Sequence, residues 1–158
     1  MTDAPGQTVW RITTRRFAEG AFSGEGDRLF GGRWNRQGQS VIYTAQSRSL
    51  ALLEMLVQDD PLRAHYVLIP AHIPADLPVE TLLPADVPAD WRISVARAAL
   101  QAIGAQWLQK VRSAVLVVPS AVVPAENNYL INPLHTDFQR ITLGQPEPLE
   151  TDLRLLRS

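Results

Sequence analysis

The 158-residue chain contains no cysteine, which excludes disulfide bridges and thiolate metal sites. A chain without cysteine suits a reducing compartment, so we expect a cytoplasmic protein. Its histidines, His65, His72 and His135, are scattered without metal-ligand spacing, and we expect no metal ion. The chain also has no excess of one charge. Its formal net charge of −1 favours neither direct nucleic-acid binding nor an anionic membrane.

Long apolar runs are missing as well. Residues 1–16 lack the apolar core of a signal peptide, and no run approaches the ~20 residues of a membrane span. Hydrophobic residues make up 46% of the chain and charged residues 20%, as in ordinary soluble globular proteins. This length and composition predict a single domain over residues 1–158, in which residues 1–7 form a loose polar lead.

The spacing of apolar residues predicts the main elements. Helices are expected over residues 50–57 and 94–111, and Ser47 or Ser49 should cap the first. Pro61 should end that helix near residues 58–61. Strands are expected at residues 8–13, 41–44, 66–69, 114–118 and 140–143, with a short strand or turn near 77–83.

Two segments favour irregular structure. Residues 17–32 hold five of the nine glycines and predict a loop with little regular structure, which we expect to lie over a ligand. Residues 126–138 are polar, aromatic and rich in turn-forming residues, with a bend at Asn132-Pro133. In the second helix, Gly104 lowers stability by roughly 1 kcal/mol relative to alanine, so we expect a packing reason for it.

Within residues 50–57, Glu54 is the one charged side chain among apolar neighbours. A helix that is apolar on all sides is normally buried, and an ionised carboxylate is costly to bury unless it is paired or hydrogen-bonded. Two interpretations stay open. Glu54 is either a structural residue tied to an arginine or a backbone N–H, or a catalytic carboxylate.

The sequence Gly31-Gly32-Arg33-Trp34-Asn35 suits an anionic ligand, although it also suits a plain turn. Adjacent glycines let the backbone approach a ligand closely, a guanidinium grips phosphate oxygens with two donors, and Trp34 offers a flat apolar face. Tyr43, in the predicted strand 41–44, is either a core residue or an aromatic ligand contact. An arginine, an aromatic ring and a carboxylate together are what a dinucleotide-cleaving site requires.

Two other polar residues favour ordinary roles. Ser120 follows the apolar strand and Pro119 without a Gly-x-Ser-x-Gly elbow, so we do not assign it as a nucleophile. His135 has the pKa range of a general base. We favour the alternative in which its ring bonds a backbone carbonyl.

Several short segments, in this order, resemble the RES domain, a family of toxins from bacterial toxin–antitoxin pairs. They are Trp10-Arg11, Gly31-Gly32-Arg33-Trp34-Asn35, Val41-Ile42-Tyr43-Thr44, Ala51-Leu52-Leu53-Glu54, Pro119-Ser120, and residues 126–135. The resemblance implies an α+β, ADP-ribosyltransferase-like fold with a mixed, mostly antiparallel sheet and two main helices. It also implies NAD as substrate and a helix-turn-helix (Xre-type) antitoxin as partner, and it leaves a toxin homodimer open.

The resemblance also assigns roles to individual residues. It implies that Glu54, Arg33 and Tyr43 are catalytic. It implies NAD contacts by Arg11, Arg33, Tyr43, Ser120, Trp34 and Asn35. In this scheme the two arginines hold the pyrophosphate, Tyr43 bounds the nicotinamide and Ser120 orients it. Glu54 stabilises the oxocarbenium-like ribose, as a carboxylate does in glycosidases.

We therefore expect a toxin that degrades NAD by cleaving the nicotinamide–ribose bond, with water or phosphate as acceptor. One alternative is a mono-ADP-ribosyltransferase that modifies a specific protein. A second alternative, from another class, is a non-catalytic module that binds a nucleotide or a partner.

Overall fold

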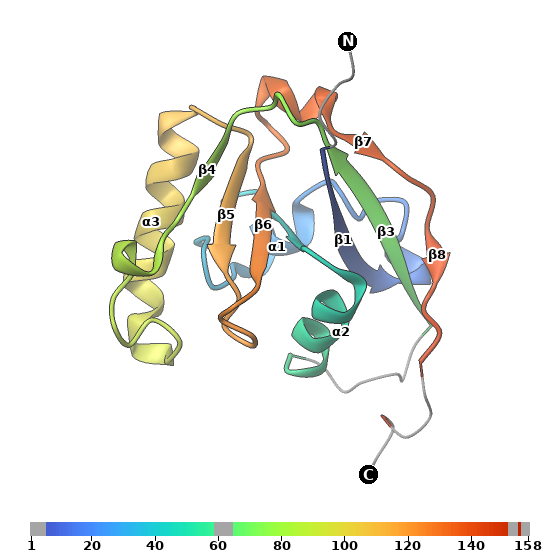
Figure 1. The fold of residues 1–158 in the computed structure, drawn as a ribbon, viewed down its shortest axis with the longest axis horizontal. Coiled ribbons are helices and arrows are strands. Elements are labelled where there is room, and N and C mark those ends of the chain that lie inside the picture. Colours follow the sequence, from blue (N-terminus) through green and yellow to red (C-terminus); the bar gives the residue numbers. More distant parts are fainter. Residues whose placement is uncertain (1–5, 59–64, 152–154, 156–158) are drawn as a thin grey trace.

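A computed structural model describes residues 6–58, 65–151 and 155, and it shows one sheet with helices packed against it (Figure 1). The strands are β1 (Gln7–Thr14), β2 (Ile42–Ala45), β3 (Tyr66–Ile73), β4 (Val79–Thr81), β5 (Val115–Pro119), β6 (Asn127–Ile131), β7 (Thr142–Leu143) and β8 (Glu147–Pro148). The α-helices are α1 (Glu25–Phe30), α2 (Arg48–Leu56) and α3 (Arg97–Lys110). Short 3-10 turns occur at Arg15–Phe17, Pro84–Asp86, Ser94–Ala96 and Thr136–Arg140.

The strand order is β4-β5-β6-β2-β1-β3-β7, and β8 also pairs with β3. Neighbouring strands are antiparallel except for the parallel pair β4 and β5. The prediction of an α+β domain with a mixed, mostly antiparallel sheet and two main helices, here α2 and α3, is therefore confirmed. No helix in the described ranges is long and apolar enough to cross a bilayer.

The sheet is weakly joined between β1 and β2. Their register holds one pair, Trp10 opposite Ala45, whereas β1 pairs with β3 along its whole length. Just past this pair, Arg11 Nη1 donates to the backbone carbonyl of Tyr43 at 3.1 Å. A side chain therefore supplies the hydrogen bond that a strand carbonyl needs where two halves of a sheet separate.

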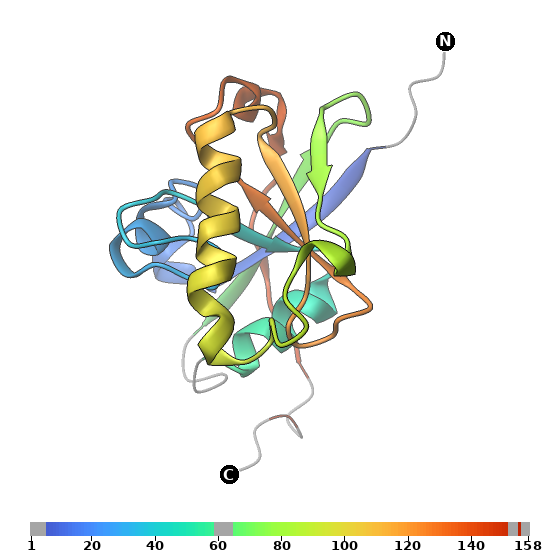
Figure 2. The same ribbon diagram turned by 90° about the vertical axis from the view of Figure 1, so that its left-hand side faces the viewer.

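Separate apolar clusters fill the space between the sheet and its covering elements. Figure 2 shows α3 lying across strands of the sheet, where Leu100 and Trp107 pack with Leu116 and Leu130. The cluster under α2 contains Leu50, Ala51, Ala45 and Leu68. A third cluster runs from Val9 and Ile42 to Ile131 and is covered by Phe22 and Phe138.

Several local predictions are confirmed. The strands predicted at 8–13, 41–44, 66–69 and 114–118 are β1, β2, β3 and β5, and the short ones near 77–83 and 140–143 are β4 and β7. Ser47 caps α2, since its side chain accepts from the Leu50 N–H at 3.1 Å. This helix ends at Leu56, slightly before the predicted end near residues 58–61, of which 59–61 lie outside the described residues.

Gly104 has the packing reason that we expected. A Cβ at this position would meet the Trp34 carbonyl oxygen at 1.7 Å, so only glycine lets α3 approach that backbone. The close approach of α3 fixes Trp34 and, next to it, Arg33.

Three local predictions are wrong. Residues 17–32 are not all irregular, because residues 25–30 form α1. Residues 126–138 are not only a turn, because β6 lies in the sheet between β2 and β5. The buried Leu130 and Ile131 outweigh the poor strand propensity of the asparagines before them. Finally, α2 is not buried on all sides, since Leu53 is 40% exposed.

Candidate active site

Glu54 lies on the half-buried part of α2 and faces the β5–β6 connection. Its Oε1 accepts hydrogen bonds from Ser120 Oγ at 2.6 Å and from Asn128 Nδ2 at 2.8 Å. Among the described residues, Oε2 accepts no hydrogen bond and no cation contacts the carboxylate. The structural interpretation named an arginine or a backbone N–H as the partner of Glu54, and the described contacts contain neither; its donors are the side chains of Ser120 and Asn128. Within the described part of the chain, one oxygen of Glu54 therefore has no hydrogen-bond donor.

Ser120 is held so that its proton points at Glu54. The side chain is 0% exposed, and its Oγ accepts from the N–H groups of Val122 and Val123, both at 3.0 Å. With both lone pairs used, the hydroxyl has only its proton to offer, and that proton goes to Glu54. The resemblance implied an NAD contact for Ser120, and that contact stays a prediction. The described contacts of the hydroxyl are to Glu54 and to the backbone of residues 122 and 123.

The turn that carries Arg33 is fixed by α3 and by its own glycines. Gln101 Nε2 donates to the carbonyls of Gly32 and Asn35, at 2.9 and 3.1 Å. Gly31 has a φ of 72°, which glycine adopts at little cost. A Cβ on Gly32 would lie 2.6 Å from the Tyr43 hydroxyl oxygen. The double glycine therefore lets Tyr43 pack directly on the backbone beside Arg33.

Tyr43 and Asn35 bond each other. The Tyr43 hydroxyl donates to Asn35 Oδ1 at 2.6 Å and accepts from the Trp34 N–H at 3.0 Å. Burial raises the pKa of Tyr43, so the phenol stays neutral at physiological pH. Asn35 Nδ2 donates to the carbonyls of Asp27 and Gln39, at 2.9 and 3.0 Å. The Tyr43 hydroxyl thus serves the turn, and a ligand could contact only its ring.

Trp34 and Asn35 do not offer the ligand surface that the sequence suggested. Trp34 is 2% exposed, Asn35 is 0% exposed, and the Trp34 ring packs 6.3 Å from the ring of Trp91, centroid to centroid. Both residues are inside the protein, so the prediction that they touch NAD directly finds no support in this geometry. Their role is to hold Arg33 and Tyr43.

A continuous set of contacts connects Arg33 to Glu54. Arg33 Nη1 lies 3.4 Å from the carbonyl oxygen of Arg92, and Arg92 Nε donates to the carbonyl of Ala121 at 2.9 Å. Ala121 follows Ser120, which bonds Glu54. These contacts link the turn that carries Arg33 to the β5–β6 connection beside Glu54. No described contact joins them directly.

Arg11 is the second arginine that the family resemblance implies for the site. Besides its bond to Tyr43, its Nε is buried and has no hydrogen-bond partner among the described residues. Burial lowers the pKa of Arg11, and the nearby Asp27 partly offsets this, but an arginine remains charged at neutral pH. Arg11 therefore has donor capacity left for an anionic ligand.

Asp27, on α1, carries a stability cost that depends on pH. Burial raises its pKa from 3.8 to about 6, against the attraction of Arg11. Below the unfolded pKa both states are protonated. As pH rises from 3.8 to about 6, the Asp27 carboxyl ionises in the unfolded chain before it ionises in the folded protein, so the free energy of unfolding falls.

We expect Asp27→Asn to raise the free energy of unfolding by up to about 3 kcal/mol near pH 8. The gain should vanish near pH 3.5. Urea melts at both pH values measure this, and an equal gain at both would contradict it.

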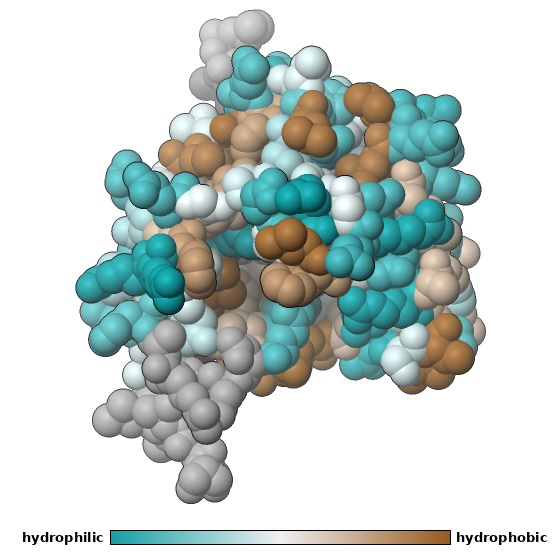
Figure 3. Space-filling view, turned by 180° about the vertical axis from the view of Figure 1, so that it is seen from behind, coloured by the Kyte–Doolittle hydropathy of each residue, from teal (hydrophilic) through white to brown (hydrophobic). Residues whose placement is uncertain are grey.

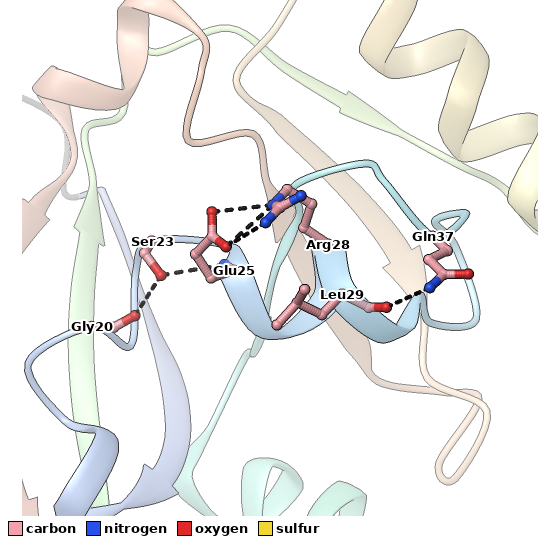
Figure 4. Close-up of polar contacts among 6 residues, drawn as sticks. All are labelled: Gly20, Ser23, Glu25, Arg28, Leu29 and Gln37. Atoms are coloured by element: carbon pink, nitrogen blue, oxygen red, sulfur yellow. Dashed lines mark hydrogen bonds and ion pairs between the residues drawn. The ribbon is translucent and has the colours of Figure 1, made fainter.

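The segment before Arg33 is ordered by local polar contacts, which Figure 4 draws. Arg28 forms an ion pair with Glu25 at 2.8 Å, Ser23 Oγ donates to the Gly20 carbonyl at 2.8 Å, and Gln37 Nε2 donates to the Leu29 carbonyl at 2.9 Å. That this segment lies over a ligand stays a prediction.

Apolar side chains of the same segment reach solvent. Phe30 is 82% exposed and Leu29 is 48% exposed. Figure 3, which views the molecule from behind, shows apolar residues scattered over a largely hydrophilic face.

His135 has the structural role that we favoured. Its Nδ1 accepts from the Asp137 N–H at 2.9 Å, which places the ring proton on Nε2, 3.0 Å from the Val111 carbonyl oxygen. No group of three or more histidine or acidic side chains in the described ranges could hold a metal ion.

Asn128 is the site residue that sequence reasoning missed. It is one of two consecutive asparagines in a segment assigned to a turn. The segment is part of the family resemblance, but the resemblance assigned Asn128 no role. Only the position of β6 beside β5 brings its amide to Glu54.

The profile of the RES domain matches residues 8–152. The chain belongs to the RES domain family. It is 41% identical over 150 residues to a Toxin Res of Yersinia enterocolitica, covering 93% of this chain and 98% of that protein. It is 36% identical over 156 residues to a Prs ADP-ribosylating toxin of Sphingobium sp., covering 95% and 97%.

A solved structure agrees with this family membership. The fold is similar to a chain in the crystal structure of the M. tuberculosis MbcT–MbcA toxin–antitoxin complex, with a TM-score of 0.77 and 25% sequence identity. The match covers 94% of this chain and 86% of that one.

Proposed function

We propose that this RES-domain protein is a toxin that cleaves the nicotinamide–ribose bond of NAD. The observation that carries the proposal is the geometry of Glu54. Two neutral donors, Ser120 and Asn128, hold one carboxylate oxygen, and the other oxygen accepts no hydrogen bond from the described residues. The toxin names of the relatives support the biological role.

In the proposed reaction, Arg33 and Arg11 bind the substrate. Arg33 is half-buried, and its guanidinium contacts within the described part of the chain are two backbone carbonyls at 3.4 Å. It therefore keeps donors for a phosphate oxygen. Arg11 has an unpartnered buried Nε. Together they would hold the pyrophosphate, which fixes the attached ribose relative to Glu54. The ring of Tyr43 would bound the nicotinamide.

In the proposed reaction, the Glu54 carboxylate acts on the bond that breaks. When the bond between nicotinamide and ribose breaks, its electron pair leaves with the nicotinamide and positive charge develops on the ribose. A fixed carboxylate near that carbon stabilises the charge, as in glycoside hydrolysis. Water as acceptor gives ADP-ribose, and phosphate gives its phosphorylated counterpart. The geometry of Glu54 serves either reaction.

Nicotinamide release tests the proposal. Purified chain, stripped of any antitoxin, is incubated with NAD in the presence and absence of phosphate, and the products are separated by chromatography. Release of free nicotinamide is the expected result, and the co-product identifies the acceptor. Intact NAD in the presence of well-folded protein would contradict the proposal.

The name of one relative favours a second candidate. A protein 36% identical to this chain is called an ADP-ribosylating toxin, and the same site would then transfer ADP-ribose to a protein side chain. Radiolabelled NAD added to cell lysate distinguishes the two. Transfer labels one discrete protein band, whereas hydrolysis or phosphorolysis consumes NAD without labelling protein.

The proposed function includes an antitoxin as a protein partner. A chain of similar fold is part of a toxin–antitoxin complex, and we propose that an antitoxin with a helix-turn-helix part inhibits this protein by covering the site. An acidic side chain or a terminal carboxylate meeting Arg33 would be a suitable contact. A co-complex in which Arg33 and Glu54 remain open to solvent would reject this mode. Such a complex would also show whether the toxin is a homodimer.

Arg33→Lys should weaken NAD binding. A lysine keeps the charge but loses the two-pronged grip on phosphate, so we expect KM for NAD to rise roughly 10- to 100-fold, the loss of one charged hydrogen bond. Steady-state kinetics measure the change. Arg36→Lys is the matched control, because Arg36 is exposed and its side chain makes no described contact. An equal rise in KM for both variants would contradict the role of Arg33.

A further inference from the structure

The amide of Asn128 has one end engaged and the other end free. Its Nδ2 donates to Glu54 Oε1 at 2.8 Å, while its Oδ1 is buried and has no hydrogen-bond partner among the described residues. The orientation is fixed by chemistry, since the flipped amide would set its oxygen against the carboxylate oxygen. A buried acceptor without a donor is uncommon in native proteins and asks for an explanation.

Two of the three buried polar atoms without a hydrogen-bond partner in the described ranges belong to residues of the proposed site. The three atoms are Arg11 Nε, Thr14 Oγ1 and Asn128 Oδ1. Arg11 bonds the backbone of Tyr43, and Asn128 bonds Glu54. Asn128 is opposite Ala45 on β2, and Ala45 is opposite Trp10 in the one pair that joins β1 to β2. Asn128 on β6 is therefore separated from the weak junction between β1 and β2 by β2 alone.

The free atoms around Glu54 define the ligand group that fits there. Glu54 Oε2 and Asn128 Oδ1 are both acceptors, and they belong to side chains that are bonded to each other. Two neighbouring acceptors suit a group with neighbouring donors, and the vicinal hydroxyls of a ribose are such a group.

We propose that Asn128 binds substrate as well as positioning Glu54, with its Oδ1 accepting a hydrogen bond from the 2′-hydroxyl of the ribose that carries the nicotinamide. This inference rests on the proposed NAD cleavage, in which Glu54 stands beside the anomeric carbon. The 2′-hydroxyl is on the adjacent carbon, so it is the nearest donor. The Nδ2 contact directs the free oxygen of Glu54 to the same sugar.

Two substitutions separate the two functions of the amide. Asn128→Ala removes both the donor and the acceptor, while Asn128→Asp keeps an acceptor oxygen and loses the donor. Each variant is assayed with NAD and with the NAD analogue that lacks the 2′-hydroxyl on the nicotinamide ribose. The ratio of the two kcat/KM values is compared between each variant and the parent. This comparison cancels the intrinsic reactivity of the sugars and any equal loss from a misplaced Glu54.

We expect Asn128→Ala to lower this ratio roughly 10-fold, the loss of one hydrogen bond to substrate, and Asn128→Asp to leave it near the parent value. In Asn128→Asp the new carboxylate faces Glu54, and like charges favour protonation. No charged group among the described residues contacts Glu54 in the parent protein, so the new carboxylate would be its charged contact. We expect the acidic limb of the kcat/KM profile to move to higher pH by about one unit or more. Asn127→Ala, whose side chain makes no described contact, is the control and should change neither measurement.

An unchanged ratio in Asn128→Ala would overturn the substrate contact, and an unshifted profile in Asn128→Asp would overturn the positioning role. Thermal melts identify a variant that does not fold, and Asn128→Leu, of similar volume, then replaces Asn128→Ala. A parent protein that leaves NAD intact would overturn the proposed function and this inference together. A parent that cleaves NAD, with variants that behave like it, overturns the inference alone.

Discussion

Glu54→Gln should abolish most NAD cleavage without unfolding the protein. The amide can still offer an oxygen to Ser120 and Asn128, so the contacts that hold the side chain at 2.6 and 2.8 Å can persist. The lost negative charge no longer stabilises the ribose cation. Removing one preorganised electrostatic group lowers kcat on the order of 10²- to 10³-fold. The initial rate of nicotinamide release measures the loss.

Glu19→Gln is the matched control, because Glu19 is exposed and its side chain makes no described contact. It should cleave NAD at the parent rate. The expected pattern is an unchanged KM with a reduced kcat in Glu54→Gln, since the arginines still bind the pyrophosphate. A Glu54→Gln protein that turns over NAD as fast as the control would show that the carboxylate has no part in the chemistry.

Gly104→Ala should destabilise the fold and also damage the site. The new Cβ would meet the Trp34 carbonyl oxygen at 1.7 Å, and backbone cannot yield as a flexible side chain does. Overpacking of this kind costs about 1–3 kcal/mol and occasionally more, which exceeds the roughly 1 kcal/mol that alanine gains in a helix. We expect a net loss of about 2 kcal/mol in the free energy of unfolding, measured by urea denaturation. The displaced Trp34 should also raise KM for NAD through Arg33.

Gly26→Ala provides the control within the same protein. Gly26 is also helical, in α1, but a Cβ there would meet nothing within 4 Å. This substitution should raise stability by up to about 1 kcal/mol through helix propensity alone. If both alanine variants were stabilised equally, the contact between α3 and the Trp34 backbone would not limit packing.

The sequence predicted the elements that carry an apolar pattern. β5 is an uninterrupted apolar run, and the cap of α2 follows from Ser47, because both signals are local. β6 could not be predicted in the same way, since its first residues are two asparagines and a tyrosine. It is a strand because β2 and β5 leave a place between them, which is a property of the whole sheet.

The candidate site shows the same division. The residue types of Arg33 and Glu54 and the anomaly of a carboxylate on an apolar helix were visible in the sequence. The partners were not, because Ser120 and Asn128 reach Glu54 from residues more than sixty positions away. Trp34 and Asn35 looked like ligand contacts beside Arg33, yet their side chains point into the protein. Adjacent residues of a tight turn can face opposite ways, and sequence spacing does not say which.

The proposed cleavage requires NAD to lie between the guanidinium of Arg33 and the carboxylate of Glu54. A crystal structure of Glu54→Gln with NAD tests this most directly, because that variant should bind the dinucleotide without consuming it. We expect pyrophosphate oxygens within hydrogen-bond distance of Arg33 and the nicotinamide ribose against residue 54. NAD bound elsewhere, or bound with its pyrophosphate away from Arg33, would contradict the account.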